Sequence, residues 1–199
     1  MPRPFARRQQ GVVLMISLIM LVAMSLAGVA LMRSVDTATA VAGNIAVKEA
    51  AVQVADRGTQ TAVAWLQNNS MGTALQNTNT ASGYFSSRPA TEPKWEQEAS
   101  WDDAVKVDGG TPDAAGNSVR YLIHRMCTQP DTAHDGKNAG VDNECGRYYE
   151  QTSASSGGSM SVGAPQFLSS PSVYYRITTR VDGPRNTISI IQTSVLVRV

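Results

Sequence analysis

The residue types able to perform chemistry are few in this 199-residue chain. The two histidines, His124 and His134, are too few for a convincing metal site or catalytic triad. The sequence lacks the short motifs of a nucleophile elbow, a zinc protease, a P-loop and a dinucleotide-binding turn. We therefore expect no catalytic residue, no cofactor and no enzymatic activity.

Acidic residues near the two cysteines have side chains that suit a cation such as Ca²⁺. These are Asp131, Asp135, Asp142 and Glu144. Their spacing does not fit an EF-hand loop, and Asp and Glu usually stay in contact with water. We predict a solvated acidic loop, and we assign no metal ligand.

The longest apolar run, Val12 to Met32, is the most informative element of the chain. The segment before it contains Arg3, Arg7 and Arg8, and the first carboxylate in the chain is Asp36. A helix needs about 20 apolar residues to cross a bilayer core, and arginines mark the cytoplasmic side of such a helix. The sequence therefore predicts a single pass through the inner membrane, with the rest of the chain outside the cytoplasm.

Four interpretations of this N-terminus remain open. A basic segment that ends in Gly11, directly before the apolar run, resembles the prepilin signal of type IV pilins and pseudopilins, in which a peptidase cuts here between Gly11 and Val12. A Sec signal peptide, with Ser25-Leu26-Ala27 as its cleavage site, and an uncleaved signal anchor are the alternatives. The pair Arg7-Arg8 also resembles a twin-arginine signal. Against a Sec signal, the apolar run continues to Met32 without a polar region.

Charge and cysteine content agree with an exported domain. The net charge is +1, which is not the strongly basic balance of a nucleic-acid-binding protein. Cys127 and Cys145 are the two cysteines, and in an oxidising compartment they are expected to form a disulfide. A bond closing a loop of this size is worth roughly 3 kcal/mol. Two free thiols are the alternative.

A long helix is expected to continue beyond the apolar run. No proline interrupts the chain between Pro4 and Pro89. Helical spacing places a polar stripe at Glu49, Gln53, Asp56, Gln60 and Gln67. An apolar stripe lies beside it, at Val47, Ala51, Val54, Ala62 and Trp65, widened by Ile45, Val52, Ala55 and Leu66. Gln67-Asn68-Asn69-Ser70 is the stop signal, so the helix would be about 85 Å long.

The remainder predicts loops followed by strands. Residues 72–116 have the composition of a loop, in which Trp95 and Trp101 are expected to anchor a cover on the core, with an exposed aromatic binding pair as the alternative. Alternating patterns predict strands over 119–124, 173–181 and 187–199, the last two joined by a turn at 182–186. The last strand changes phase after Ile190, which indicates a bulge or burial on both faces. Residues 152–170 are expected to form a long mobile loop.

Several of these segments together resemble the PilX minor pilins of type IV pilus systems. The resemblance is carried by Gln10-Gly11-Val12-Val13-Leu14, Leu31-Met32-Arg33-Ser34, Ala42-Gly43-Asn44 and Lys48 to Asp56, and more loosely by Tyr175-Arg176-Ile177-Thr178 and Ile191-Gln192-Thr193. It covers roughly the first 66 residues well and the last 25 loosely. Major pilins usually have glutamate as the fifth mature residue, where this chain has Ile16. Both PilX and the K-type pseudopilins of type II secretion lack that glutamate.

The resemblance implies an α+β, type IV pilin-like fold in which a long N-terminal helix packs on a small antiparallel β-sheet. Its parts would be a leader (1–11), a transmembrane and filament-core helix (12–32), an amphipathic helix (33–70) and a periplasmic head domain (71–199). Assembly contacts would involve Val12, Ile16, Gly28, Val47, Ala51 and Val54. Gly28 would serve close helix packing, or alternatively act as a flexing point.

As the resemblance implies, the protein would help prime pilus assembly near the filament tip. Its partners would be other minor pilins, the major pilin, the prepilin peptidase, the inner-membrane assembly platform and a PilY-type tip adhesin, but no nucleic acid. It would move from the inner membrane to the extracellular filament. The alternatives are a K-like pseudopilin of type II secretion and a monomeric, membrane-anchored periplasmic binding protein.

Overall fold

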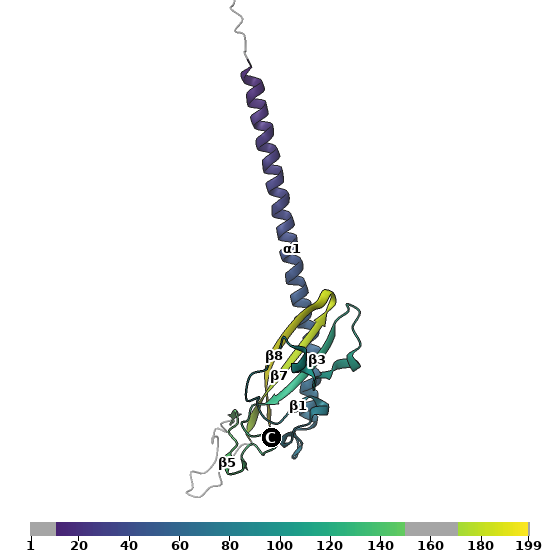
Figure 1. Cartoon of the computed structure of the whole chain (residues 1–199), viewed down its shortest axis with the longest axis vertical. Coiled ribbons are helices and arrows are strands. Elements are labelled where there is room, and N and C mark those ends of the chain that lie inside the picture. Colours follow the sequence, from purple (N-terminus) through teal and green to yellow (C-terminus); the bar gives the residue numbers. More distant parts are fainter. Residues whose placement is uncertain (1–10, 150–170, 199) are drawn as a thin grey trace, which may run out of the picture. The chain divides into compact units, whose positions relative to one another are not determined.

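The computed structural model describes residues 11–149 and 171–198, so the predicted leader (except Gly11) and the predicted loop at 152–170 lie outside the described residues. One long helix, α1 (Val12–Asn68), precedes all strands (Figure 1). The strands are β1 (Tyr84–Phe85), β2 (Val105–Lys106), β3 (Ser118–Arg125), β4 (Lys137–Asn138), β5 (Val141–Asp142), β6 (Arg147–Tyr148), β7 (Ser172–Gly183) and β8 (Thr187–Arg198). Short 3-10 helices lie at Ala74–Gln76, Thr80–Ser82, Glu98–Trp101, Val107–Gly110 and Pro184–Asn186.

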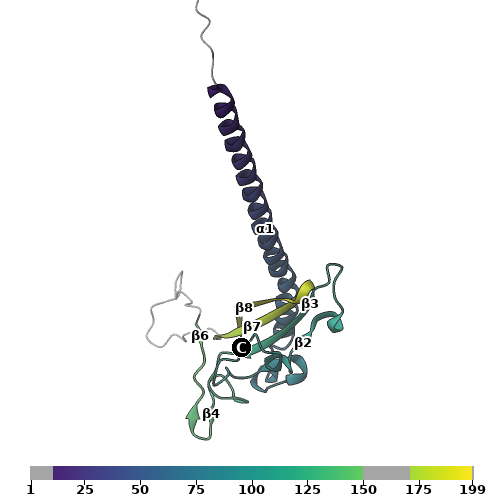
Figure 2. The ribbon, with the colours of Figure 1, turned by 45° about the horizontal axis from the view of Figure 1, so that its top comes forward.

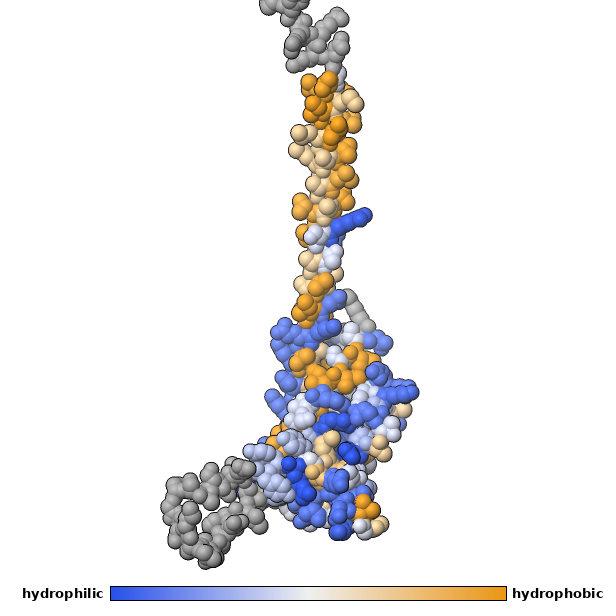
Figure 3. Space-filling model, turned by 90° about the vertical axis from the view of Figure 1, so that its left-hand side faces the viewer, coloured by the Kyte–Doolittle hydropathy of each residue, from blue (hydrophilic) through white to orange (hydrophobic). Residues whose placement is uncertain are grey.

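The chain divides into two compact units, Met1–Lys48 and Glu49–Val199, which we call the stem and the head. In the described stem, the side chains of α1 have no protein neighbours that bury them. The helix is long and apolar enough there to cross a membrane. Its hydrophobic side chains appear orange over the face of the stem in view in Figure 3.

The head is built on a mixed, mostly antiparallel sheet (Figure 2). The long strand β7 is central, with β3 antiparallel on one side and β8 antiparallel on the other. Strand β2 is antiparallel to β3, and β6 is antiparallel to the start of β7. The predicted antiparallel pairing is confirmed for β3, β7 and β8, whereas the two-residue strand β1, which was not predicted, runs parallel to β3 at one edge.

The β7–β8 hairpin has the predicted turn but not the bulge, which was one of the two explanations offered for the change of phase. Its register is continuous from Ser172↔Arg198 to Gly183↔Thr187, so β8 contains no bulge. Because side chains alternate along a strand, both faces of β8 carry apolar residues. Val197 is buried on the helix-facing side, whereas Ile188 and Leu196 on the other side are 45% and 44% exposed.

The last part of α1 packs on the face of the sheet formed by the odd-numbered residues of β3 and β7. Its buried residues are Ala55, Gly58, Ala62 and Leu66, which share one side of the helix. They meet a core in which Tyr84, Ile123, Tyr175 and Ile177 are fully buried. The predicted polar stripe, from Glu49 to Gln67, is exposed as expected. The helix ends at Asn68, at the predicted stop signal.

The predicted apolar stripe divides into two parts. Ala55, Ala62 and Leu66 are buried in the head, and Val54 and Trp65 pack against its core. The N-terminal members of the stripe are exposed, with Ile45 at 58%, Val47 at 54% and Val52 at 49%. Among the described residues, the sheet therefore covers only the C-terminal part of the apolar stripe of α1.

Candidate functional sites of the stem and the head

The stem presents the residues to which the sequence assigned processing and assembly. Gly11 has a left-handed backbone with φ of 57° and is exposed. Val12 and Ile16 are 63% and 52% exposed. At Gly28 a Cβ would meet no atom within 4 Å, so the packing partner expected there does not come from the described chain. Large apolar surfaces of this kind are the surfaces that lipid or other helices cover.

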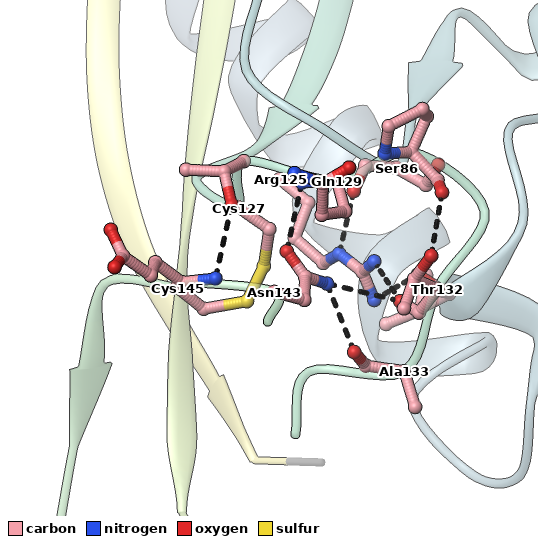
Figure 4. Close-up of a disulfide and its surroundings, with 12 residues drawn as sticks. Ser86, Arg125, Cys127, Gln129, Thr132, Ala133, Asn143 and Cys145 are labelled. Atoms are coloured by element: carbon pink, nitrogen blue, oxygen red, sulfur yellow. Dashed lines mark hydrogen bonds between the residues drawn. A yellow bond between two sulfur atoms is a disulfide. The ribbon is translucent and has the colours of Figure 1, made fainter. Parts of the chain in front are cut away.

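Cys127 and Cys145 are bonded. Beside the bond, the backbone N–H of Thr128 donates to the Glu144 carbonyl at 3.0 Å, and the Glu144 N–H donates to Thr128 Oγ1 at 3.0 Å. Asn143 is 3% exposed, and its amide bridges the loop by accepting from Gln129 N–H and donating to the Ala133 carbonyl (Figure 4). These contacts order the loop closed by the disulfide.

The acidic residues of this loop are spread over its surface. Asp142 forms an exposed ion pair with Lys137 at 3.0 Å. Asp131 Oδ1 accepts from the backbone N–H of Thr78 at 2.7 Å and from Ser86 Oγ at 3.1 Å. The Thr78 hydrogen bond is the main reason that the pKa of Asp131 lies below its usual value. Within the described residues, no three His, Cys, Asp or Glu side chains are grouped as metal ligands.

Arg125, at the end of β3, is a buried cation held by carbonyl oxygens. Its side chain is 2% exposed, and it donates to the carbonyls of Ser86 at 2.8 Å, Leu75 at 3.0 Å and Thr132 (Figure 4). Burying a charge is costly unless its hydrogen bonds are satisfied. Arg125 therefore joins three loop segments at one point, and sequence reasoning missed it because arginine usually indicates the surface.

A covering segment, which we define as residues 87–104, lies on the face of the sheet opposite α1. That face carries Arg120 of β3 and Arg180 of β7, which both pair with Glu98 of the segment. Asp182 also contacts both arginines, at 2.9 and 2.8 Å. The two guanidinium carbons lie 6.0 and 5.8 Å from the centre of the Trp101 ring, within the range of cation–π attraction.

The second contact of the covering segment is made by Glu92 and Trp95. Arg176 of β7 donates to Glu92 at 3.0 Å and lies 6.0 Å from the Trp95 ring centre. Partial burial tends to raise the pKa of Glu92, but hydrogen bonds from Trp95 and Arg176 outweigh it and hold that pKa below its usual value. Trp101 is 2% exposed, so the anchoring role predicted for it is confirmed. Trp95 is only half-buried.

A cavity of about 330 Å³ lies between the covering segment and the end of β3. Its walls include Phe85 of β1, Trp95 and His124 of β3. The Phe85 ring stacks on His124 with centroids 4.9 Å apart, and Trp95 meets His124 edge-on at 6.1 Å. His124 is 5% exposed, and its Nδ1 has no hydrogen-bond partner in the described structure.

Burial is the main reason that the pKa of His124 is lowered to about 4; the nearby Arg176 cation also lowers this pKa, and the Glu92 carboxylate opposes both effects only in part. The imidazole is therefore neutral at physiological pH. His134, the other histidine considered at the outset, lies in the disulfide loop and does not line the cavity. Sequence reasoning missed the cavity because its walls come from three separated segments.

Comparison with family models, curated proteins and solved structures finds no match to this chain.

Proposed function

We propose that this protein is a PilX-like minor pilin that helps prime the assembly of type IV pili. The observation that carries the proposal is the helix α1. Its stem part exposes apolar side chains from Val12 to Met32, and its last part packs through Ala55, Gly58, Ala62 and Leu66 on a mixed, mostly antiparallel sheet. A pilin needs both parts in one helix, since the first must serve in the bilayer and later in a filament core.

A pilin helix must be stable first in the lipid bilayer and then among the helices of a filament, and the stem of α1 suits both surroundings. In a bilayer, lipid covers the apolar side chains of the stem. In a filament, the helices of neighbouring subunits cover them instead, and small residues such as Gly28 and Ala42 allow close approach. Val47, Ala51 and Val54 continue this surface toward the head; Val47 is 54% exposed, and Ala51 and Val54 are partly buried.

The proposed partners follow from the resemblance. They are other minor pilins and the major pilin along the helix, the prepilin peptidase at Gly11, and the assembly platform in the inner membrane. A PilY-type adhesin would be displayed with this subunit at the tip. The head would lie in the periplasm before assembly and outside the cell afterwards.

Processing of the leader tests the proposal. We expect N-terminal mass spectrometry to find a chain beginning at Val12 in cells with the prepilin peptidase, and at Met1 in cells without it. Gly11→Leu should block cleavage, because the small residue lets the backbone enter the peptidase. Gly28→Ala is the matched control, since a Cβ there meets no atom within 4 Å. A chain that begins at Met1 in both strains, or at Gly28, would refute the pilin function.

A second measurement distinguishes a type IV pilus subunit from a type II secretion pseudopilin. If the processed protein is recovered in sheared pili, the pilus assignment holds. If it is absent from pili and its deletion abolishes type II secretion, the K-like pseudopilin alternative replaces it.

A further inference from the structure

We propose that the cavity beneath the covering segment binds a neutral sugar ring, at a site formed by Trp95, His124, Arg88, Asp102 and Asp103. This inference concerns the head alone and does not depend on the function of the stem. Its starting point is a cavity of about 330 Å³, which lies at the lower end of the range for small-molecule sites.

The apolar part of the cavity suits a flat ligand with C–H groups. Its walls include the rings of Phe85, Pro89, Pro93 and Trp95 and the side chain of Leu122. Aromatic and proline rings offer broad, rigid surfaces that lose little conformational entropy when a ligand packs on them. One face of a pyranose ring presents C–H groups of matching size.

The polar part of the cavity consists of groups without partners in the described structure. Arg88, Asp102 and Asp103 line the cavity, and no side-chain hydrogen bond or ion pair occupies them among the described residues. These three residues are exposed, whereas the Nδ1 atom of His124 in the cavity wall is buried and unpartnered. A ligand in the cavity therefore finds Arg88, Asp102 and Asp103 open to hydrogen bonding.

The presence of both carboxylates and a guanidinium at the cavity favours a ligand with several hydroxyl groups. Carboxylates only accept hydrogen bonds and a guanidinium only donates them, whereas a hydroxyl group does both. Neighbouring hydroxyls of a sugar can therefore donate to Asp102 or Asp103 while accepting from Arg88. Planar charged side chains are well suited to such paired contacts.

Two other ligand classes fit less well. An organic cation would meet Arg88 at the cavity and Arg176, whose guanidinium already lies 6.0 Å from the Trp95 ring centre. An extended peptide would need free main-chain groups, but the backbone here is already paired, with Ile123 N–H donating to Gly83 at 2.8 Å and Arg88 N–H donating to Cys127 at 2.9 Å.

The two histidines provide an internal comparison for a binding test. The probes are the methyl glycosides of glucose, galactose, mannose and N-acetylglucosamine, added to the full chain in a detergent without a sugar headgroup. Imidazole ¹⁵N NMR follows His124 at the cavity and His134 in the disulfide loop. We expect at least one glycoside to shift the His124 signals in a saturable manner and to leave His134 unchanged.

Variants decide whether the cavity is responsible. Arg88→Gln together with Asp102→Asn should weaken the binding of that glycoside at least tenfold. Glu96→Gln, which removes an acid of the same segment that does not line the cavity, should leave the affinity unchanged. No saturable shift with any glycoside, or equal affinity in the double variant, overturns the proposal. A shift produced only by tetramethylammonium or by a proline-rich peptide also overturns it, in favour of a cation or peptide site.

Discussion

Gly58 of α1 and Thr179 of β7 approach so closely that a Cβ on Gly58 would lie 2.7 Å from the Thr179 Cγ2 atom. The same Cβ would lie 2.8 Å from Val119 Cγ1 on β3. Both distances are shorter than atoms tolerate, so the absence of a side chain at Gly58 sets how near the helix lies to the sheet. This contact determines the packing of the head around Ala55 and Ala62.

We expect Gly58→Ala to destabilise the head. Overpacking of a core costs about 1–3 kcal/mol, and it opposes a gain of about 1 kcal/mol from replacing a helical glycine by alanine. Urea unfolding of the full chain, followed by tryptophan fluorescence, measures the balance. Gly43→Ala is the control, because a Cβ there meets no atom within 4 Å. Thr179→Ser removes the clashing methyl group and should recover part of the loss, and no recovery would show that this contact is not the cause.

Arg125→Lys should lower the free energy of unfolding of the head by about 2–4 kcal/mol. Lysine keeps the charge, but a single ammonium group cannot reach the three carbonyls that the guanidinium joins, and an unsatisfied buried polar group costs about 1–3 kcal/mol. Arg147→Lys, at an exposed position of β6, should change stability by less than about 0.5 kcal/mol. Equal effects in the two variants would refute the role given to Arg125.

The buried His124 predicts a dependence of stability on pH. Its pKa is about 4 in the folded head against 6.5 for the free side chain. Between these values the unfolded state binds more protons, so the free energy of unfolding falls as the pH is lowered from about 6.5 to 4. The whole decrease from this residue is about 3 kcal/mol.

Urea unfolding at several pH values measures this decrease. His124→Phe should remove the part between pH 6.5 and 5, because the carboxylates with lowered pKa, such as Glu92 and Asp131, act only at lower pH. An unchanged profile in His124→Phe would contradict the assignment.

Thiol counting tests the disulfide. Purified, non-reduced protein should have no reactive thiol after unfolding, because Cys127 and Cys145 are bonded. Replacing both by serine should lower the free energy of unfolding by roughly 3 kcal/mol. Two reactive thiols in the unreduced protein would show that the bond does not form in the cell.

The elements with regular periodicity could be predicted from the sequence, and the contacts between distant segments could not. Helical spacing correctly placed Ala62 and Leu66 on the buried face and Gln60 on the exposed face. Gly58 carries no hydrophobic signal of its own, and its importance arises from Thr179, a residue of the distant strand β7. The role of Arg125 could not be predicted either, because the carbonyl groups that it contacts lie in loops without a periodic sequence pattern.

The contacts of the covering segment could be predicted only in part from the sequence. The two tryptophans were expected to anchor it, and Trp101 does so between Arg120 and Arg180. Arg120 and Arg180 lie on the face of β3 and β7 that points away from α1, and the alternation of the strands did not predict what covers that face. The acidic residues within 87–104 could have indicated that this segment covers the arginine-bearing face of the sheet.

If the proposed minor-pilin function is correct, Ile16 predicts that this subunit lies at or near the pilus tip in few copies. A carboxylate is costly in hydrocarbon unless it finds a partner, and in the pilin family the partner of the glutamate at this place is the terminal amine of a neighbouring subunit. A subunit at the tip has no subunit above it to supply that amine, so it can enter the filament through apolar packing alone. Deletion should sharply reduce pilus number, and Ile16→Glu should not be needed for assembly. Quantitative mass spectrometry of sheared pili decides the question, because abundance equal to that of the major subunit is incompatible with a place at the tip.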